Sequence, residues 1–217
     1  MFDFHRHITN SKTIDNALYN TTSIKEWDYN TKHFSIGLLA NNINKDNDYY
    51  INKMEKLLIK NPKFHIGEIG LDNRFNNIDI QVDLFVKTLK LAKEYNRLFT
   101  IHIVKNNNLL LNILNENKKY LPNHIIYHGF NKSLDLAKQL KYYNTIISIN
   151  PKSLNTKLMY DIKALDKLGF LVESDWDKKN DEGYDKYFSS FINILEEKKA
   201  TKFKDVNNEF RSILENF

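Results

Sequence analysis

The chain of 217 residues contains no cysteine, so disulfide bonds and thiolate chemistry are excluded. Any metal site must therefore be built from histidine and carboxylate side chains. Only six glycines and three prolines interrupt the chain, and no stretch reads as a linker or an internal repeat. Because 41% of the residues are hydrophobic, enough for one substantial core, we expect a single domain over residues 1–217.

Long apolar segments are missing as well. No run of 18 apolar residues exists, which argues against a membrane span. The first residues, MFDFHRHI, lack the basic region and the apolar core of a signal peptide. We therefore expect a cytoplasmic monomer without a membrane partner.

The charge balance favours basic residues, with a net charge of +5 and a pI near 9.0. Such a balance suits a polyanionic substrate. Lysine, asparagine and isoleucine are frequent along the whole chain, however, so lysine is its default surface residue. The charge alone is a weak indication of a nucleic-acid partner.

Short apolar runs alternate with longer segments of helical period, a pattern typical of parallel α/β folds. The predicted strands are residues 2–5, 17–24, 33–39, 64–71, 99–104, 124–130, 145–149 and 170–175. The predicted helices with an apolar face include 79–96, 133–143 and 184–199, whereas 41–50 and 105–108 read as loops. Eight strands in alternation with helices predict a closed (β/α)₈ TIM barrel.

The stretch HIGEIGLDNRF (65–75) places a carboxylate, Glu68, inside an apolar run, and a second one, Asp72, follows it. A buried unpaired carboxylate costs several kcal/mol, so Glu68 must be neutralised, hydrogen-bonded or bound to a cation.

Metal-competent side chains fall at or near the carboxyl ends of five predicted strands: His5, His7, Glu68, His102, His128 and Asp175. The carboxyl ends of parallel strands share one rim, where active sites of such folds lie. Six dispersed residues are therefore expected to converge there.

His5 and His7 are two residues apart, so on a strand they point the same way, and Asp3 shares that face. Phe2 and Phe4 take the other face. A bound metal would satisfy the two imidazoles, and Asp3 could orient one of them by a hydrogen bond.

Each of these residues has a structural alternative. A lone strand histidine such as His102 or His128 is more often a hydrogen-bonded core residue, and Glu68 could pair with a lysine or arginine. The structural alternatives would all have to hold at once, each for a residue at or near the carboxyl end of a strand, so a shared metal site is the favoured interpretation. The other histidines, His33, His65 and His124, begin strands, so we assign them to the opposite rim and to structure.

Together these residues resemble the TatD-type metal-dependent deoxyribonucleases, a branch of the metal-dependent hydrolase superfamily built on a (β/α)₈ barrel. The resemblance rests on DFHRHI (3–8), IGEIGLD (66–72), the segment 81–94, IH (101–102), HGF (128–130) and LVESD (171–175). Their order and approximate spacing match the family over essentially the whole chain, and GEIGLD is the most specific motif.

The resemblance implies a two-metal site. One ion would be held by His5, His7, Glu68 and Asp175; the other by Glu68, His102 and His128, with Glu68 bridging. Asp175 would also be the general base, Glu173 a nearby supporting or substrate-facing carboxylate, and Asp72 a buried supporting acceptor. The ligand types fit Zn²⁺, Mn²⁺ or Mg²⁺, with the imidazoles favouring the first two. The implied reaction is hydrolysis of a phosphate ester, foremost a phosphodiester in DNA.

The substrate side departs from the family pattern. The Gly-x-His-Pro expected after the third strand is replaced by GLLAN (37–41), and the segments after His102 and Asp175 also differ. Four residues on the predicted rim loops could contact phosphate or stack on a base: Lys105, Lys132, Lys152 and Trp176. Two alternatives therefore stay open: a hydrolase of another ester, amide or small phosphoester on the same scaffold, and a non-catalytic metal-binding protein.

Overall fold

Eight parallel strands follow one another around a barrel in the computed structural model, which describes residues 1–10, 14–29 and 31–217. Each strand pairs in parallel with the next one in the chain. The strands are β1 (Asp3–Arg6), β2 (Ala17–Asn20), β3 (Phe34–Leu38), β4 (Phe64–Asp72), β5 (Phe99–Val104), β6 (Ile125–Tyr127), β7 (Thr145–Ile149) and β8 (Leu171–Val172).

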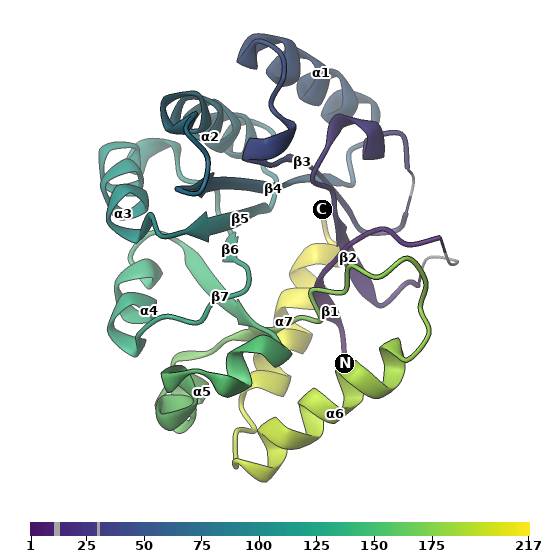
Figure 1. Ribbon diagram of the computed structural model, residues 1–217, viewed down its shortest axis with the longest axis vertical. Coiled ribbons are helices and arrows are strands. Elements are labelled where there is room, and N and C mark those ends of the chain that lie inside the picture. Colours follow the sequence, from purple (N-terminus) through teal and green to yellow (C-terminus); the bar gives the residue numbers. More distant parts are fainter. Residues whose placement is uncertain (11–13, 30) are drawn as a thin grey trace.

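The barrel is closed by the residues that follow β8. Arg6 of β1 and Trp176 form a parallel bridge. The Asp175 N–H donates to the His5 carbonyl at 3.0 Å, and the His7 N–H donates to the Trp176 carbonyl at 3.0 Å. The predicted TIM-barrel architecture is thus confirmed (Figure 1). The closure holds Asp175 beside His5 of β1 and His7, which follows it.

Helices lie outside the ring of strands (Figure 1). They are α1 (Asn47–Lys60), α2 (Ile78–Glu94), α3 (Asn107–Glu116), α4 (Leu134–Lys141), α5 (Ile162–Leu168), α6 (Tyr184–Glu197) and α7 (Phe203–Glu215). The predictions for 79–96, 133–143 and 184–199 are confirmed within two residues. None of the helices in the described part of the chain is long and apolar enough to cross a membrane.

Two segments predicted as loops instead contain helix starts. The α1 helix begins at Asn47, where the Asp46 carboxylate accepts the Asp48 N–H at 2.8 Å and caps the helix. Similarly, α3 begins at Asn107. Asparagine and aspartate dominate both segments, and these residues suit helix caps as well as turns. The predicted strand 17–24 is also shorter, because Ile24–Glu26 form a 3₁₀ turn.

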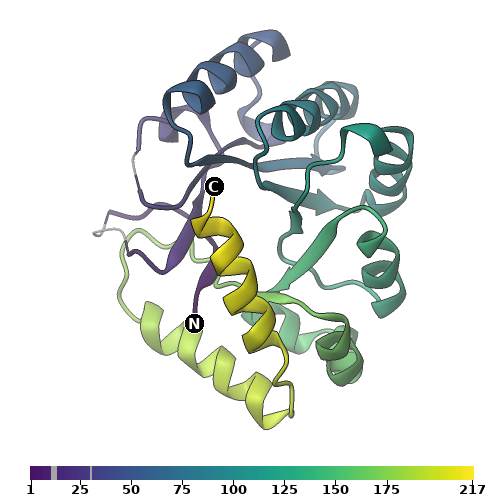
Figure 2. The ribbon, with the colours of Figure 1, turned by 180° about the vertical axis from the view of Figure 1, so that it is seen from behind.

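Helix α7 crosses the amino-terminal end of the barrel (Figure 2). Its Phe210 and Leu214 pack on a cluster of residues from four strands and from the positions just before β1 and β5: Phe2, Phe4, Leu18, Leu98, Ile126 and Leu171. The three histidines assigned to this rim lie here, since the rings of His33, His65 and His124 contact Phe2, Phe217 and Phe210 respectively. The opposite rim is left for the polar site.

Candidate metal centre

Glu68 enters the barrel through an irregularity in β4. Ile66 pairs with Phe99 and Ile69 with Ile101, so between these pairs β4 has one residue more than β5. Both isoleucines pack between the strands and the surrounding helices. The additional residue lets Glu68 face the interior between them, where its side chain is only 2% exposed.

Residues of β3 and of the segment after β2 accommodate the additional residue of β4. The Thr21 carbonyl, just after β2, accepts the Glu68 N–H at 3.0 Å, and the Thr21 hydroxyl accepts the Gly37 N–H at 2.7 Å. A Cβ atom on Gly37 of β3 would lie 2.0 Å from the Glu68 nitrogen. Sequence reasoning missed both residues, because neither carries metal-binding chemistry; the glycine in GLLAN was the only available signal.

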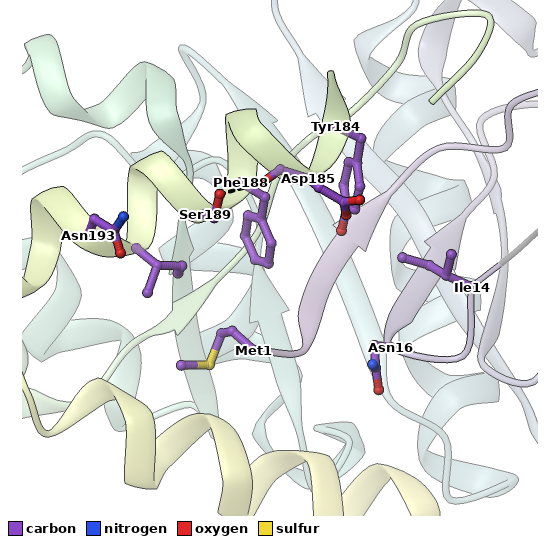
Figure 3. A pocket seen from close by; sticks show the side chains of 9 residues that line it. Met1, Ile14, Asn16, Tyr184, Asp185, Phe188, Ser189 and Asn193 are labelled. Carbon is purple, nitrogen blue, oxygen red and sulfur yellow. Dashed lines mark hydrogen bonds between the residues drawn. The ribbon is translucent and has the colours of Figure 1, made fainter. Parts of the chain in front are cut away.

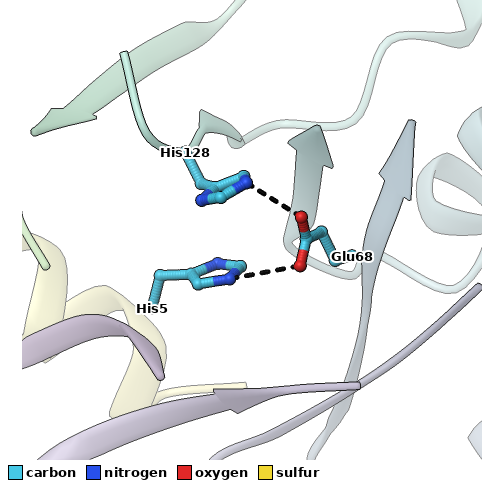
Figure 4. A group of neighbouring side chains, drawn as sticks. All are labelled: His5, Glu68 and His128. Carbon is cyan, nitrogen blue, oxygen red and sulfur yellow. Dashed lines mark ion pairs between the residues drawn. The ribbon is translucent and has the colours of Figure 1, made fainter. Parts of the chain in front are cut away.

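Four imidazoles surround the Glu68 carboxylate. His102 Nδ1 and His128 Nε2 lie 2.6 and 2.8 Å from Oε1. His5 Nε2 and His7 Nε2 lie 3.3 and 3.8 Å from Oε2. Figure 4 shows His5, from β1, and His128, which directly follows β6, pointing at the two oxygens of Glu68. Residues from four separate parts of the chain thus meet at one carboxylate.

Asp175 completes the cluster. Its Oδ1 lies 3.5 Å from His7 Nε2, and its Oδ2 accepts from Lys152 Nζ at 2.6 Å. Ligand atoms of two sets lie within 4.8 Å of one another: one set is His5, Glu68 and His128, and the other is His5, His7 and Asp175. The structure therefore brings all six predicted side chains together at the carboxyl-end rim.

The pKa values of the ionisable groups in the cluster are strongly shifted. Burial would raise the pKa of Glu68, but the facing His128, together with His5 and His102, holds the pKa well below its usual range. Burial would likewise raise the pKa of Asp175, but its hydrogen bond with His7 lowers it. Burial would lower the pKa of His128, yet the Glu68 carboxylate raises it well above the usual value. Both carboxylates are therefore ionised at neutral pH and suited to bind cations.

The hydrogen bonding of the cluster is incomplete in a way that a cation would remedy. Within the described residues, the buried atoms without a hydrogen bond include His5 Nε2 and Glu68 Oε2, which face each other at 3.3 Å. Buried polar atoms are nearly always satisfied, so their concentration at one place needs an explanation. Imidazole nitrogens and carboxylate oxygens form a donor set for Zn²⁺ or Mn²⁺. The residues fit divalent metal ions.

Glu173 lies behind His128, away from the open rim. Its side chain is fully buried, and Oε1 lies 3.4 Å from His128 Nδ1. Oε1 also accepts the Gly129 N–H at 2.7 Å and the Asn150 side-chain amide at 3.1 Å. The Ser148 hydroxyl donates to Oε2. This geometry supports the His128 ring and leaves no path to a substrate-facing position.

Asp72 and Arg74 form a pair beside the cluster. Arg74 Nε and Nη2 donate to Asp72 Oδ2 at 3.0 and 2.5 Å, and the Arg74 N–H donates to Oδ1 at 3.0 Å. The same Oδ2 lies 3.8 Å from His102 Nε2. The buried Asp72 thus lies between the predicted ligand His102 and the exposed Arg74. The sequence had suggested no role for Arg74.

Asp3 does not share the face of the two histidines. Asp3 pairs with Ala17 and Arg6 with Tyr19, so β1 has one additional residue and its alternation shifts. The Asp3 carboxylate consequently accepts from the Tyr184 hydroxyl of α6 at 2.9 Å, outside the barrel. It also accepts the backbone N–H groups of His5 and Ser174 at 3.2 and 2.8 Å. Asp3 therefore joins the closing segments and does not orient an imidazole.

A cavity of about 440 Å³ opens beside the cluster over the ends of β4 to β8. Lys105, Lys132 and Lys152 line it, as expected for rim residues, and Arg74 joins them. Trp176 does not: its side chain is 3% exposed, and its indole N–H donates to the Asn180 carbonyl at 3.0 Å. The suggestion that Trp176 stacks on a base is wrong, because its ring packs on Tyr184 and Tyr187.

A second cavity, of about 370 Å³, lies outside the barrel between the first residues and α6 (Figure 3). Its lining comprises Met1, Ile14, Asn16, Tyr184, Asp185, Phe188, Ser189, Ile192 and Asn193. It contains one carboxylate and no histidine, so it offers no comparable chemistry.

Comparison with known proteins agrees with this geometry. The family model described as TatD related DNase matches residues 2–217. The chain belongs to the TatD family. Among solved structures, YJJV, a TatD homologue of Escherichia coli, superposes with a TM-score of 0.69 at 21% identity, covering 88% of this chain and 83% of that one.

Two further TatD-like or hydrolase relatives are more partial. A TatD family hydrolase of Entamoeba histolytica superposes with a TM-score of 0.58 at 19% identity, covering 74% of this chain and 61% of that one. An uncharacterized metal-dependent hydrolase of Methanocaldococcus jannaschii is 30% identical over 109 residues, 49% of this chain and 41% of that relative. The TatD chain described here thus matches less than half of the length of this curated relative. The two structural similarities, both under 25% identity, establish the shared barrel.

Proposed function

We propose that this TatD-family chain is a metal-dependent hydrolase of phosphate esters, foremost of phosphodiester bonds in DNA. It would act as a monomer whose residues 1–217 form one catalytic domain. The observation that carries the proposal is the buried Glu68 carboxylate, enclosed by four imidazoles at the rim where barrel enzymes hold their active sites.

The residues divide into two ligand sets that share Glu68. His5, His7, Glu68 and Asp175 would hold one divalent ion, and Glu68, His102 and His128 the other. The distances of 2.6 and 2.8 Å from one Glu68 oxygen to His102 and His128 support the second set. The imidazole-rich donor set favours Zn²⁺ or Mn²⁺ over Mg²⁺.

Divalent ions held there would lower the pKa of a bound water and stabilise negative charge on a phosphate. Asp175 would accept the proton of the attacking water as the general base. Its ionised carboxylate is exposed enough to reach water, and His7 and Lys152 hold its two oxygens. Glu173 would keep the His128 ring in place without touching the substrate.

Elemental analysis of the purified protein, followed by hydrolysis assays, tests the proposal. We expect up to two equivalents of metal and cleavage of single-stranded DNA and of a model phosphodiester. Cleavage of a lactone alone would contradict the phosphoester proposal. Absence of stoichiometric metal, with activity unaffected by Glu68→Ala, would contradict the metal centre itself.

Asp175→Asn separates metal binding from chemistry. The amide keeps the shape of the carboxylate but cannot accept the proton, so we expect metal to be retained at least in part. The rate of hydrolysis should fall by about 10²–10⁴-fold, the usual contribution of a general base. Single-turnover assays at saturating metal measure this loss, and Asp177→Asn on the same segment is the matched control. An unchanged rate would assign the base to another group.

A further inference from the structure

One buried polar side chain lies outside the barrel and has no part in the candidate metal centre described above. Gln81 is near the start of α2, in the segment 81–94 of the family resemblance, and it is 1% exposed. Its Oε1 accepts the Asp72 N–H at 2.6 Å, and its Nε2 donates to the Asp72 carbonyl at 3.2 Å. One side chain therefore holds both backbone groups of the last residue of β4.

Gln81 stands where a strand neighbour is missing. The pairing of β3 with β4 ends at Leu38 and Ile69, three residues before Asp72. On its other side Asp72 pairs with Val104 of β5. A side-chain amide offers a donor and an acceptor as a peptide group does. The Gln81 amide thus continues the hydrogen bonding of β4 beyond the end of β3.

The amide of Gln81 is fixed in its turn. Nε2 also donates to Asn77 Oδ1 at 2.8 Å, and the Asn77 amide donates to the Ala40 carbonyl at 3.1 Å. Ala40 belongs to GLLAN (37–41), which replaces the Gly-x-His-Pro of the family pattern. Because Nε2 has two acceptors and Oε1 has a donor, the orientation of the Gln81 amide is determined.

The Asp72 side chain extends this arrangement to a predicted ligand. His102 turns Nδ1 to Glu68 Oε1, at 2.6 Å, and Nε2 to Asp72 Oδ2, at 3.8 Å. An imidazole that binds a metal through Nδ1 carries its proton on Nε2, and this N–H requires an acceptor. A distance of 3.8 Å is longer than a hydrogen bond, so the placement of Asp72 decides whether the contact forms.

Arg74 is a weaker support for the same carboxylate. Its guanidinium donates to Asp72 Oδ2, but the Arg74 side chain is 59% exposed. Exposed ion pairs contribute little, because both side chains remain mobile and hydrated. Gln81 is buried, and Leu84 and Phe85 of the same helix pack in the core. The buried contact with the backbone therefore holds Asp72 more firmly than the exposed ion pair.

We propose that Gln81 is a positioning residue of the candidate metal centre. By holding the backbone of Asp72, it keeps the Asp72 carboxylate facing His102 Nε2 and so fixes the ring whose Nδ1 would bind the metal. The inference rests on the metal centre of the proposed function and not on the identity of the substrate. A Gln81 that only docks α2 on β4 would affect stability and leave metal affinity unchanged.

Gln81→Met tests this role, because methionine fills a similar volume without the hydrogen bonds. We expect zinc affinity to fall by about 10–100-fold, the usual effect of losing the support of a metal-binding histidine. Competition with a chromogenic chelator measures the affinity. Gln139→Met, at an exposed position of α4, is the matched control and should bind zinc as tightly as the parent protein.

Asn77→Ala is a milder second variant. It removes the outer acceptor of the Gln81 amide and leaves both contacts with Asp72 available, so we expect a smaller loss of zinc affinity in the same direction. If Gln81→Met does not fold, Asn77→Ala decides, and unchanged affinity in that variant counts against the inference.

A double-mutant cycle with Asp72→Asn shows whether Gln81 acts through Asp72. If it does, adding Gln81→Met to Asp72→Asn should lower zinc affinity by less than about twofold further, whereas independent effects would multiply. The ring N–H resonances of the zinc-loaded protein give a second measurement. In Gln81→Met the Nε2–H of His102 should exchange faster with water, and the Nδ1–H of His128, which Glu173 faces at 3.4 Å, should be unaffected.

Three results would overturn the inference: unchanged zinc affinity in Gln81→Met, independent losses in the cycle, or an equal loss in Gln139→Met. A parent protein that binds zinc but cleaves no phosphodiester would contradict the proposed function alone, since chelator competition still measures the effect of Gln81. A parent protein without affinity for zinc would refute both.

Discussion

Glu173 illustrates how one buried residue can serve the centre without meeting a substrate. Its oxygens accept hydrogen bonds from Gly129, Asn150 and Ser148, and the carboxylate lies against the far nitrogen of His128. Carboxylates in this position fix the orientation and basicity of a metal-binding imidazole. Three neighbours hold Glu173 in turn, so the His128 ring has little freedom to rotate.

We expect Glu173→Gln to lower metal affinity by about 10–100-fold, because the isosteric amide keeps the neighbouring hydrogen bonds but loses the charge facing His128. Competition with a chromogenic chelator measures the affinity, and the exposed Glu182→Gln is the control. A variant with unchanged metal affinity and reduced turnover would instead indicate that Glu173 contacts the substrate.

Gly37 is a second single residue on which the site depends, because it has no Cβ atom. A Cβ at this position would lie 2.0 Å from the Glu68 nitrogen and 2.3 Å from the Gly67 carbonyl carbon. Neither backbone atom can move without disturbing the additional residue of β4, which turns the Glu68 side chain into the barrel. Hence the glycine is required for the geometry of the site.

Gly37→Ala should therefore abolish stoichiometric metal binding and destabilise the protein by about 1–3 kcal/mol, as overpacking does. Elemental analysis and urea unfolding measure the two effects. Gly183→Ala is the control: a Cβ there meets nothing within 4 Å, although its φ of +78° strains any other residue. It should lose stability alone, and metal binding retained in Gly37→Ala would refute the steric explanation.

At the scale of elements, the connection from β8 to α6 closes the barrel and carries Asp175. The indole of Trp176 is buried in it, and Asp181 pairs with the fully buried Arg6 of β1. The Arg6 guanidinium lies 3.8 Å over the Tyr184 ring of α6. Arg6, between the candidate metal ligands His5 and His7, thus fixes the connection to β1 and α6.

Asp181→Asn tests this anchoring. The amide leaves the buried Arg6 charge without its carboxylate, so we expect a loss of about 1–3 kcal/mol of unfolding free energy. Hydrolysis should decrease as well, because Asp175 lies on the loosened connection. Thermal unfolding and turnover are compared with Asp185→Asn, an exposed carboxylate at the start of α6. Equal behaviour of the two variants would argue against an anchoring role.

At the scale of the whole molecule, α7 seals the end of the barrel opposite the candidate metal centre, and the buried His65 there contacts the ring of Phe217, which follows α7. Burial, with smaller contributions from Arg97 and His33, lowers the pKa of His65 to about 3. In the unfolded chain its pKa is near 6.5. Acid therefore favours the unfolded state, which alone binds this proton.

The resulting stability is complete above pH 6.5 and is lost as pH falls towards 3, by up to about 1.4 kcal/mol per pH unit. His65→Gln removes the titrating group, so we expect its unfolding free energy to depend less on pH in this window. Urea unfolding at several pH values, as the difference between variant and parent, isolates His65 from the histidines of the centre. Parallel curves for the two proteins would contradict the assignment.

The barrel, and the gathering of the candidate metal ligands at one rim, were accessible from sequence because they depend on local pattern. Apolar runs such as 99–104 and 145–149 identify strands, and histidines or carboxylates at strand ends indicate the active rim. The helix-start signals at Asn47 and Asn107 were ambiguous, since asparagine also favours turns.

By itself the sequence determined a (β/α)₈ barrel and the chemical character of its rim, because periodicity and side-chain type are properties of each segment alone. The tertiary structure decided what depends on pairing between distant segments. The additional residue in β1 moved Asp3 to the outer side, and the one in β4 turned Glu68 inward. Alternation along a strand predicts a face only when the register is regular. Register is set by the neighbouring strands, so only the assembled barrel reveals it.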